Sequence, residues 1–212
     1  MENNRYKNIP HKTIERLSQY RRALQIAAEK GKTNIFSHEI AALLHITAVQ
    51  VRRDLMLIGY SGSLRKGYDI NDLIHLIGEL IDSPKGQKVA IFGMGDLGRA
   101  IINYFQGKRE KLQITVGFDI NPEKTNRKIA GIPCYHLEKI TEIISNEGIK
   151  IGILTVPGDQ ADETVRLMVE AGIKGILNYT PTPVEVPDDV YLEEYNMISS
   201  LEKVAFYVKE KG

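Results

Sequence analysis

Three glycines in the middle of the chain have the spacing G-x-G-x-x-G, which recurs where a protein backbone holds the pyrophosphate of a dinucleotide. Gly93 would permit a tight turn, Gly95 would let the pyrophosphate approach the backbone, and Gly98 would let a helix pack close to the preceding strand. The N-terminus of that helix would offer unpaired N–H groups and the positive end of its dipole to the phosphates. The pattern predicts a nucleotide site that includes Gly93, Met94, Gly95, Asp96, Leu97 and Gly98.

An acidic residue, Asp119, ends the next apolar segment about 20 residues after the glycines, where dinucleotide-binding proteins place the acid that accepts ribose hydroxyls. Its carboxylate would repel the 2′-phosphate of NADP(H) by like charge. Lys124 and Arg127 lie just downstream, and basic residues there could instead accommodate a phosphate. We give the acid more weight, so the segment predicts NAD(H) and not NADP(H). The alternative is a plain strand-to-helix turn with packing glycines.

Apolar and amphipathic segments alternate around these residues, as expected for β-strands separated by α-helices. Strands are expected at 88–92, 114–119, 149–156 and 174–179, and helices up to about residue 105 and at 137–146, 159–171 and 199–209. This order predicts the α/β fold class, with a Rossmann-like parallel sheet that carries helices on both faces.

The first 82 residues lack this alternation and indicate mainly helices. We expect helices at 11–30, from Ser37, at 48–58 and at 70–81, with the Ser37 and Thr47 hydroxyls as N-caps. A short helix, a turn and a longer helix have the proportions of a helix-turn-helix. The segment 61–66, which contains glycine and basic residues, would add a hairpin wing. The sequence therefore predicts an N-terminal winged helix-turn-helix domain.

The second helix of this motif has two different faces. Val51, Leu55 and Ile58 have helical spacing and would face the core, which leaves polar and basic side chains on the rest of the helix. Gln can pair with adenine and Arg with guanine in the major groove, while hydroxyls and Arg contact phosphates. The predicted DNA-binding residues are Ser37, Thr47, Gln50, Arg52, Arg53, Arg65 and Lys66. The alternative is a helical dimerisation module with a solvated basic face.

Charge is distributed unevenly along the chain. Residues 1–68 contain 12 Lys or Arg and 5 Asp or Glu, whereas residues 69–212 contain 16 and 22. A basic surface attracts polyanions, nucleic acid first among them. With the turn-rich stretch near Pro84, this predicts a DNA-binding domain at 1–82, a linker at 83–87, a nucleotide domain at 88–198 and a separate C-terminal helix at 199–212.

Other functional classes find little support in the composition. No apolar run is long enough to cross a membrane, and the N-terminus has no signal-peptide pattern. The single cysteine, Cys134, indicates a reducing compartment, so the cytoplasm is expected, and its thiol is expected to be a buried small apolar group. We expect neither metal ligands nor catalytic residues among the five histidines, which are His11, His38, His45, His75 and His136.

A winged helix joined to a Rossmann-like domain in one chain of this length resembles the Rex family of redox-sensing transcriptional repressors. The motifs that carry the resemblance are AVQVRRDL at 48–55, GY at 67–68, GxGxxGRA at 93–100, FDxxP at 118–122, LTVP at 154–157 and AGIKGILN at 171–178. The resemblance covers almost the whole chain. It implies a homodimer that binds double-stranded operator DNA, senses NADH and NAD+, and is released when NADH replaces NAD+.

The resemblance also implies individual roles. Thr155, Val156 and Pro157 would line the nucleotide near its middle, Ile120 would lie beside Asp119, and Tyr104 would lie near the nicotinamide. The final helix would be swapped between subunits. Three features depart from the family. The wing reads Ser63-Leu64-Arg65-Lys66, and the segment after the last expected strand reads Asn178-Tyr179-Thr180-Pro181 where relatives usually have Asn-Phe-Ala-Pro. Asn196 stands where many relatives have an acid that can pair with an Arg of the first helix, for which Arg22 is the candidate.

Two further classes use a similar glycine loop. An NAD-dependent oxidoreductase with a fused helical module would need an acid/base residue and room for a substrate domain, and 86–212 barely accommodates the nucleotide domain. A CoA-binding module would lack the winged helix and would not favour Asp119. We therefore predict a regulator and not an enzyme, in which the nucleotide is a signal that biases DNA binding.

Overall fold

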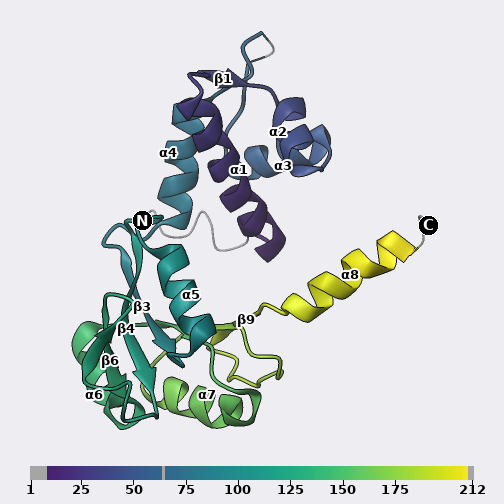
Figure 1. Cartoon of the computed structure of the whole chain (residues 1–212). Helices are drawn as coiled ribbons and strands as arrows, with labels where there is room; N and C mark the ends of the chain where they lie inside the picture. Colours follow the sequence, from purple (N-terminus) through teal and green to yellow (C-terminus); the bar gives the residue numbers. More distant parts are fainter. Residues whose placement is uncertain (1–8, 64, 210–212) are drawn as a thin grey trace. The chain divides into compact units, whose positions relative to one another are not determined.

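The chain folds into two units, one from Met1 to Pro84 and one from Lys85 to Gly212. The structure is a computed structural model that describes residues 9–63 and 65–209, drawn in colour in Figure 1. Three parts of the sequence predictions lie outside the described residues. They are residues 1–8 of the DNA-binding domain, Leu64 of the wing and residues 210–212 of the C-terminal helix. The two units are described separately below.

The N-terminal unit is a small helical domain with a short sheet. Its elements are α1 (His11–Glu29), β1 (Asn34–Ile35), α2 (Ser37–Leu44), α3 (Ala48–Leu57), β2 (Tyr68–Asp69) and α4 (Ile70–Ile81). Val51, Leu55 and Ile58 are buried, as their spacing predicted, and they share one core with Leu17 and Leu24 of α1. Apolar side chains of α1, α2 and α4 therefore hold α3 in place.

The wing differs in detail from the expected hairpin. β2 pairs with β1, an antiparallel partner that lies far upstream and that the sequence analysis did not identify. Beyond this pair, Ser63 and Gly67 form an isolated bridge in which each N–H donates to the other residue's carbonyl, at 2.8 and 2.9 Å. Gly67 has φ +71° and lies against the Ile35 carbonyl, so no side chain fits there. The wing is thus closed by a glycine and anchored on β1.

The predicted cap of α2 is wrong. The N-cap is Phe36, and Ser37 is the first helical residue. The Glu39 carboxylate accepts a hydrogen bond from the Phe36 N–H at 2.8 Å, so an acid in the first turn serves the cap in place of a hydroxyl. The predicted cap of α3 is confirmed, because the Thr47 hydroxyl accepts a hydrogen bond from the Gln50 N–H at 3.1 Å.

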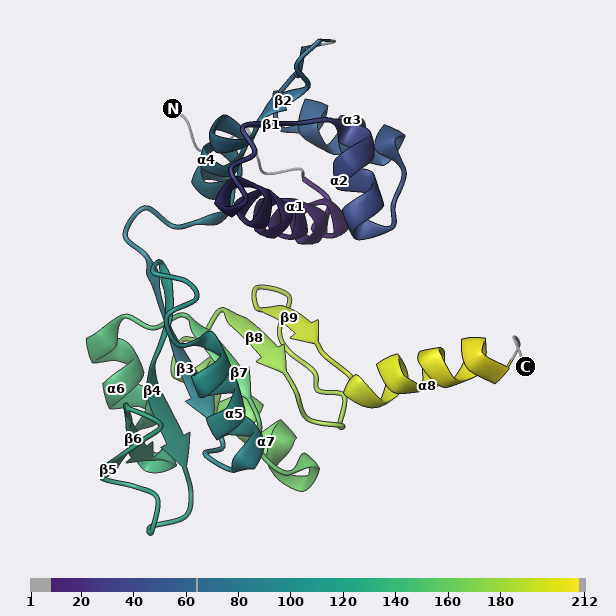
Figure 2. The same cartoon turned by 45° about the horizontal axis from the view of Figure 1, so that its top comes forward.

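The C-terminal unit is built on a seven-stranded sheet with the order β5-β6-β4-β3-β7-β8-β9, and Figure 2 shows these strands side by side. All neighbours are parallel except β5 and β6. The strands are β3 (Gln87–Phe92), β4 (Leu112–Asp119), β5 (Arg127–Ile129), β6 (Ile132–His136), β7 (Ile151–Leu154), β8 (Gly175–Asn178) and β9 (Tyr191–Glu194). The sequence analysis identified β3, β4, β7 and β8 and missed the other three.

Helices cover both faces of this sheet, as predicted. They are α5 (Asp96–Phe105), α6 (Ile140–Glu147) and α7 (Ala161–Glu170), with the 3-10 turns η1 (Leu137–Lys139) and η2 (Gly158–Gln160). A fourth helix of this unit, α8 (Met197–Lys209), follows β9. The alternating side chains of β3 divide the core: Val89 and Ile91 pack with Ile101 of α5, whereas Ala90 and Phe92 pack with residues of α6 and α7. Packing on both faces of the sheet therefore fixes β3, the strand from which the glycine loop starts.

The last helix, α8, differs from the others because all its described residues are exposed. Its exposed apolar side chains include Leu201, Val204 and Val208, which repeat at helical spacing. None of the helices in the described part of the chain is long and apolar enough to span a bilayer.

Candidate functional site

A cleft of about 480 Å³ lies at the carboxyl ends of β3, β4 and β7. This is the edge at which open parallel sheets bind ligands. Nine of the twelve predicted nucleotide-binding residues line it: Gly93, Gly95, Asp96, Leu97, Asp119, Ile120, Thr155, Val156 and Pro157. The sequence analysis did not assign the remaining lining residues, which are Phe92, Phe118, Asn121, Lys124, Leu137, Gln160 and Thr164.

The glycine loop has the geometry that its three glycines predicted. Gly93 has φ +98°, and a Cβ there would lie 2.7 Å from the Thr155 carbonyl. A Cβ on Gly98 would lie 2.1 Å from the Gly93 carbonyl oxygen, so α5 begins in direct contact with the loop. Gly95 is different, because nothing lies within 4 Å of the Cβ position, and this open space borders the cleft. The loop therefore fits a pyrophosphate at the N-terminus of α5.

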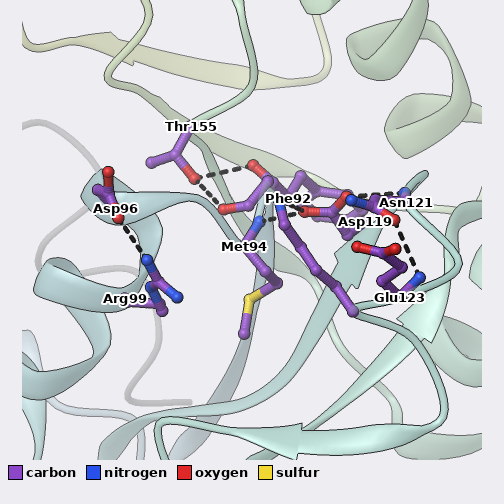
Figure 3. Close-up of polar contacts among 10 residues, drawn as sticks. Phe92, Met94, Asp96, Arg99, Asp119, Asn121, Glu123 and Thr155 are labelled. Atoms are coloured by element: carbon purple, nitrogen blue, oxygen red, sulfur yellow. Dashed lines mark hydrogen bonds and ion pairs between the residues drawn. The ribbon is translucent and has the colours of Figure 1, made fainter.

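Thr155 fixes the far side of this loop. Its hydroxyl is shared between the carbonyl oxygens of Phe92 and Gly93, at 2.9 and 2.8 Å. Figure 3 shows Thr155 next to Phe92. Thr155 follows β7, so one side chain connects the ends of two neighbouring parallel strands at the floor of the cleft. These hydrogen bonds satisfy the two carbonyls and fix the start of the glycine loop against the end of β7.

Replacing Gly98 with alanine is expected to lower the free energy of unfolding by about 1–2 kcal/mol, because the new methyl group would overlap the Gly93 carbonyl and displace the loop. The same displacement should weaken NADH binding, measured by nicotinamide fluorescence. Gly175→Ala is the matched control, since a Cβ on Gly175 meets nothing within 4 Å. Equal urea midpoints and equal NADH affinities in the two variants would contradict this account of the loop.

Asp119 is held at the end of β4 by donors on three sides. Its Oδ2 accepts hydrogen bonds from the Met94 N–H at 2.9 Å and the Lys124 ammonium at 3.0 Å, and its Oδ1 accepts one from the Asn121 N–H at 2.9 Å. Figure 3 shows Met94, Asp119 and Asn121. Burial alone would raise the pKa of this carboxyl, but the three donors bring the pKa below its usual value. Asp119 is thus a fixed negative charge facing the cleft.

Three residues predicted to bind nucleotide do not line the cleft. The Met94 side chain is fully buried and packs against Gly117, so its N–H to Asp119 is what it contributes to the site. Gly98 lies beneath the loop. Tyr104 lies near the end of α5 with 54% of its surface exposed and the Lys108 ammonium 3.2 Å from its ring centroid. About two helical turns, a rise of about 10 Å along the axis of α5, separate Tyr104 from the loop residues that begin the same helix.

The two downstream cations have different positions. Lys124 lines the cleft and forms an ion pair with Asp119, whereas Arg127 is exposed on the edge strand β5 and is not a lining residue. A further ion pair joins Arg99 to Asp96 in the first turn of α5, and Figure 3 shows it at the mouth of the loop. Arg99 therefore offsets part of the negative charge that Asp96 places at the N-terminus of α5.

The second group of predicted site residues lies at the start of α2, on α3 with its N-cap, and on the wing. Arg52 and Arg53 are exposed on α3, and Arg65 and Lys66 are exposed on the wing. The Arg52 guanidinium donates to the Ser37 hydroxyl at 3.2 Å, which ties the start of α2 to α3. Arg52 and Arg53 thus give an exposed basic surface to α3, which is the element that a helix-turn-helix inserts in the major groove.

A buried polar cluster holds α3 against α1. The Asp54 carboxylate is almost fully buried and accepts two hydrogen bonds from Arg16, at 2.6 and 2.7 Å, and one from the Tyr20 hydroxyl at 2.6 Å. The Gln50 amide also donates to it, at 2.9 Å. Hydrogen bonds to Asp54 raise the pKa of Arg16, and burial followed by the Asp54 bond raises the pKa of Tyr20. Sequence reasoning missed this cluster, and it assigned Gln50 to DNA alone.

Potential metal ligands and the single cysteine are the other chemically active side chains of the described residues. Within residues 9–63 and 65–209, no group of three or more His, Cys, Asp and Glu side chains is arranged to hold a metal ion. Cys134 is buried, as expected, and burial together with the Asp119 carboxylate raises the pKa of its thiol to about 11. The thiol therefore stays protonated and is a poor nucleophile at neutral pH.

Two family models match the chain. One, described as "CoA binding domain", matches residues 84–182, and the other, described as "Putative DNA-binding protein N-terminus", matches residues 8–55. The first covers the unit that contains the glycine loop as far as residue 182, without β9 and α8, and corresponds to the CoA-binding alternative considered above. The second covers α1, α2 and most of α3.

Relatives match over nearly the full length. A redox-sensing transcriptional repressor Rex of Anoxybacillus flavithermus is 33% identical over 99% of both chains. The crystal structure of RSP in complex with β-NAD+ and operator DNA has a TM-score of 0.87 and 33% identity, and it covers 96% of this chain and 94% of RSP. The structure of RSP with β-NADH has a TM-score of 0.85 and 32% identity, covering 97% and 96%. Both halves of the molecule thus have counterparts in one kind of protein.

Proposed function

The chain belongs to the Rex family of redox-sensing transcriptional repressors, and we propose that it binds operator DNA as a homodimer and is released when NADH takes the place of NAD+. It is a regulator and not an enzyme, since its full-length relatives are repressors. The observation that carries the proposal is the union in one chain of an exposed basic recognition helix with a glycine-loop cleft that ends at Asp119.

The cleft residues would hold the nucleotide as a signal. The first N–H groups of α5 beside Gly95 would bind the pyrophosphate, Asp119 would accept hydrogen bonds from the adenosine ribose, and Thr155–Pro157 would line its middle. The two redox forms of the ligand, NAD+ and NADH, differ by one charge and in the planarity of the nicotinamide ring. The family resemblance alone assigns Tyr104 to the nicotinamide end.

The N-terminal unit would hold the DNA. Arg53 and Gln50 would contact base edges from α3, whereas Ser37, Thr47 and Arg52 would contact phosphates. On the wing, Arg65 and Lys66 would reach the backbone or the minor groove. We retain the division into a DNA-binding domain at 1–82, a linker at 83–87, a nucleotide domain at 88–198 and a C-terminal helix at 199–212.

The two sites would be coupled through the dimer. The recognition helices of a symmetric dimer must match half-sites one helical turn apart, so a small change in dimer closure is enough to abolish binding. Because linkage is reciprocal, operator DNA must weaken NADH binding by the factor by which NADH weakens DNA binding. We infer that this repressor acts in the cytoplasm, in agreement with its single cysteine, which forms no disulfide.

We assign the exposed apolar side chains of α8, which include Leu201, Val204 and Val208, to the dimer interface, with this helix swapped onto the partner subunit. Leu201→Glu should shift the protein from dimer to monomer, because a charge would enter an apolar interface. Analytical ultracentrifugation measures the change, and Lys203→Glu, which alters a charged residue exposed on the same helix, is the matched control. A Leu201→Glu protein that remains as dimeric as the control would contradict the assignment.

The proposed function is tested with DNA that the protein itself selects. Duplexes enriched from a random library by the full chain with NAD+ should contain an inverted repeat. Adding NADH should release the selected duplex in a gel-shift titration, whereas NADPH at the same concentration should leave it bound. Indifference of the complex to NADH, or equal release by NADPH, would contradict the proposed function.

A further inference from the structure

The carboxylate of Asp119 already accepts three hydrogen bonds from the protein itself. Met94 N–H and the Lys124 ammonium donate to Oδ2, and Asn121 N–H donates to Oδ1. A carboxylate offers about four acceptor positions, two on each oxygen. About one position therefore remains, on Oδ1, whereas the two hydroxyls of a ribose present two donors.

Only one of the three donors is able to leave. The Met94 N–H is fixed by a fully buried side chain and by the tight turn at Gly93, and the Asn121 N–H is fixed by the short turn that follows β4. The Lys124 side chain is 31% exposed and flexible, and it lines the cleft. Acceptance of both ribose hydroxyls by Asp119 thus requires Lys124 to move away from Oδ2.

Without the carboxylate, these same donors would form a site for an anion. Two N–H groups and one ammonium converge on the space that the carboxylate oxygens occupy, and charge-assisted bonds of this kind are the ones that hold phosphate. We propose that Lys124 is a specificity-determining residue of the nucleotide cleft, where it forms a 2′-phosphate site that the Asp119 carboxylate masks. This inference rests on the proposed function, because it concerns the same cleft.

The position of Arg127 identifies Lys124 as the cation concerned. Arg127 has the same charge and is close in sequence, but it is exposed on β5 and does not line the cleft. Arg127→Met therefore removes one positive charge from the same region without touching Asp119. It is the matched control for Lys124→Met.

The test measures dissociation constants of the full chain for NADH and NADPH by nicotinamide fluorescence, with thermal shift as a second readout. Asp119→Ser should increase NADPH affinity by about tenfold or more, since one or more charge-assisted hydrogen bonds replace a repulsion. Adding Lys124→Met to Asp119→Ser should abolish this gain, whereas adding Arg127→Met should preserve it. The inference is overturned if the Asp119→Ser/Lys124→Met protein binds NADPH as tightly as Asp119→Ser.

A single variant that keeps Asp119 makes the test independent of how well Asp119→Ser folds. Lys124→Met alone should increase the ratio of the NADPH to the NADH dissociation constant by about tenfold, because the residual attraction for the 2′-phosphate is lost while the competitor for Oδ2 is removed. An unchanged ratio would overturn the inference. Failure of the unaltered chain to bind NADH would instead contradict the proposed function.

Discussion

Replacing Asp54 with alanine should lower the free energy of unfolding of the N-terminal unit by about 3 kcal/mol, because three side chains would lose their common acceptor. Arg16, Tyr20 and Gln50 all donate to this carboxylate, and the Tyr20 side chain is fully buried. The Arg16 side chain is 21% exposed, so water would solvate part of its charge, and the loss should fall at the lower end of the range for a broken buried ion pair.

Urea unfolding followed by circular dichroism measures this loss in the full chain. Glu29→Ala, which removes an exposed acid from the end of α1, is the matched control and should change the stability by less than about 0.5 kcal/mol. Because Asp54 also holds Gln50, the folded fraction of the Asp54→Ala protein should bind operator more weakly. A stability within 0.5 kcal/mol of the control would show that the cluster does not hold α3 against α1.

The same carboxylate makes stability depend on pH. Burial would raise the pKa of Asp54, but hydrogen bonds from Arg16, Tyr20 and Gln50 lower the pKa below its usual value. A lowered folded-state pKa means that the stabilisation is complete above the unfolded-state value, about 3.9, and is lost as pH falls through the lower folded-state value. Urea midpoints should therefore fall below about pH 4. Asp54→Asn should reduce this pH dependence, and an equally steep fall in Asp54→Asn would contradict the assignment.

Arg53→Ala should weaken binding of the selected operator by about 10- to 100-fold, since a side chain that reads a base contributes about 1–3 kcal/mol. The residue is exposed on α3 and belongs to the unit that does not contain the nucleotide cleft, so the NADH dissociation constant should not change. Fluorescence anisotropy with labelled operator measures the first quantity, and nicotinamide fluorescence measures the second.

Lys30→Ala is the control for Arg53, because Lys30 is an exposed cation at the end of α1 and not on the recognition helix. The control should alter operator affinity only slightly and through long-range charge, an effect that salt screens. Equal losses in the two variants would mean that α3 is not the reading element and that the basic domain acts through its net charge alone.

The parts of the fold that depend on neighbouring residues could be predicted from the sequence. The periodicity of Val51, Leu55 and Ile58 located the buried face of α3, and the glycine spacing located the loop that contacts Asp119 through the Met94 N–H. Short strands carried no comparable signal. β6 contains Pro133, and β5 and β9 lie at the sheet edges, where few apolar residues are needed.

Contacts between distant side chains could not be predicted in this way. In the sequence, nothing distinguishes Asp54 from an exposed charged residue of α3. Its partners Arg16 and Tyr20 lie 38 and 34 residues away. Lys124 appeared only as a possible competitor of Asp119, whereas the structure places it in an ion pair with that residue. Such pairings follow from how the elements pack, and no local pattern records them.

The central claim is that the redox state of the bound nucleotide determines the affinity of this chain for operator DNA. The most direct test is the dissociation constant of the selected operator duplex, measured by fluorescence anisotropy at constant total nucleotide while the ratio of NADH to NAD+ is raised. We predict that operator affinity falls steadily as the ratio rises, by about tenfold or more, within the usual range of allosteric coupling. An operator affinity that is the same in NADH as in NAD+ would contradict the account.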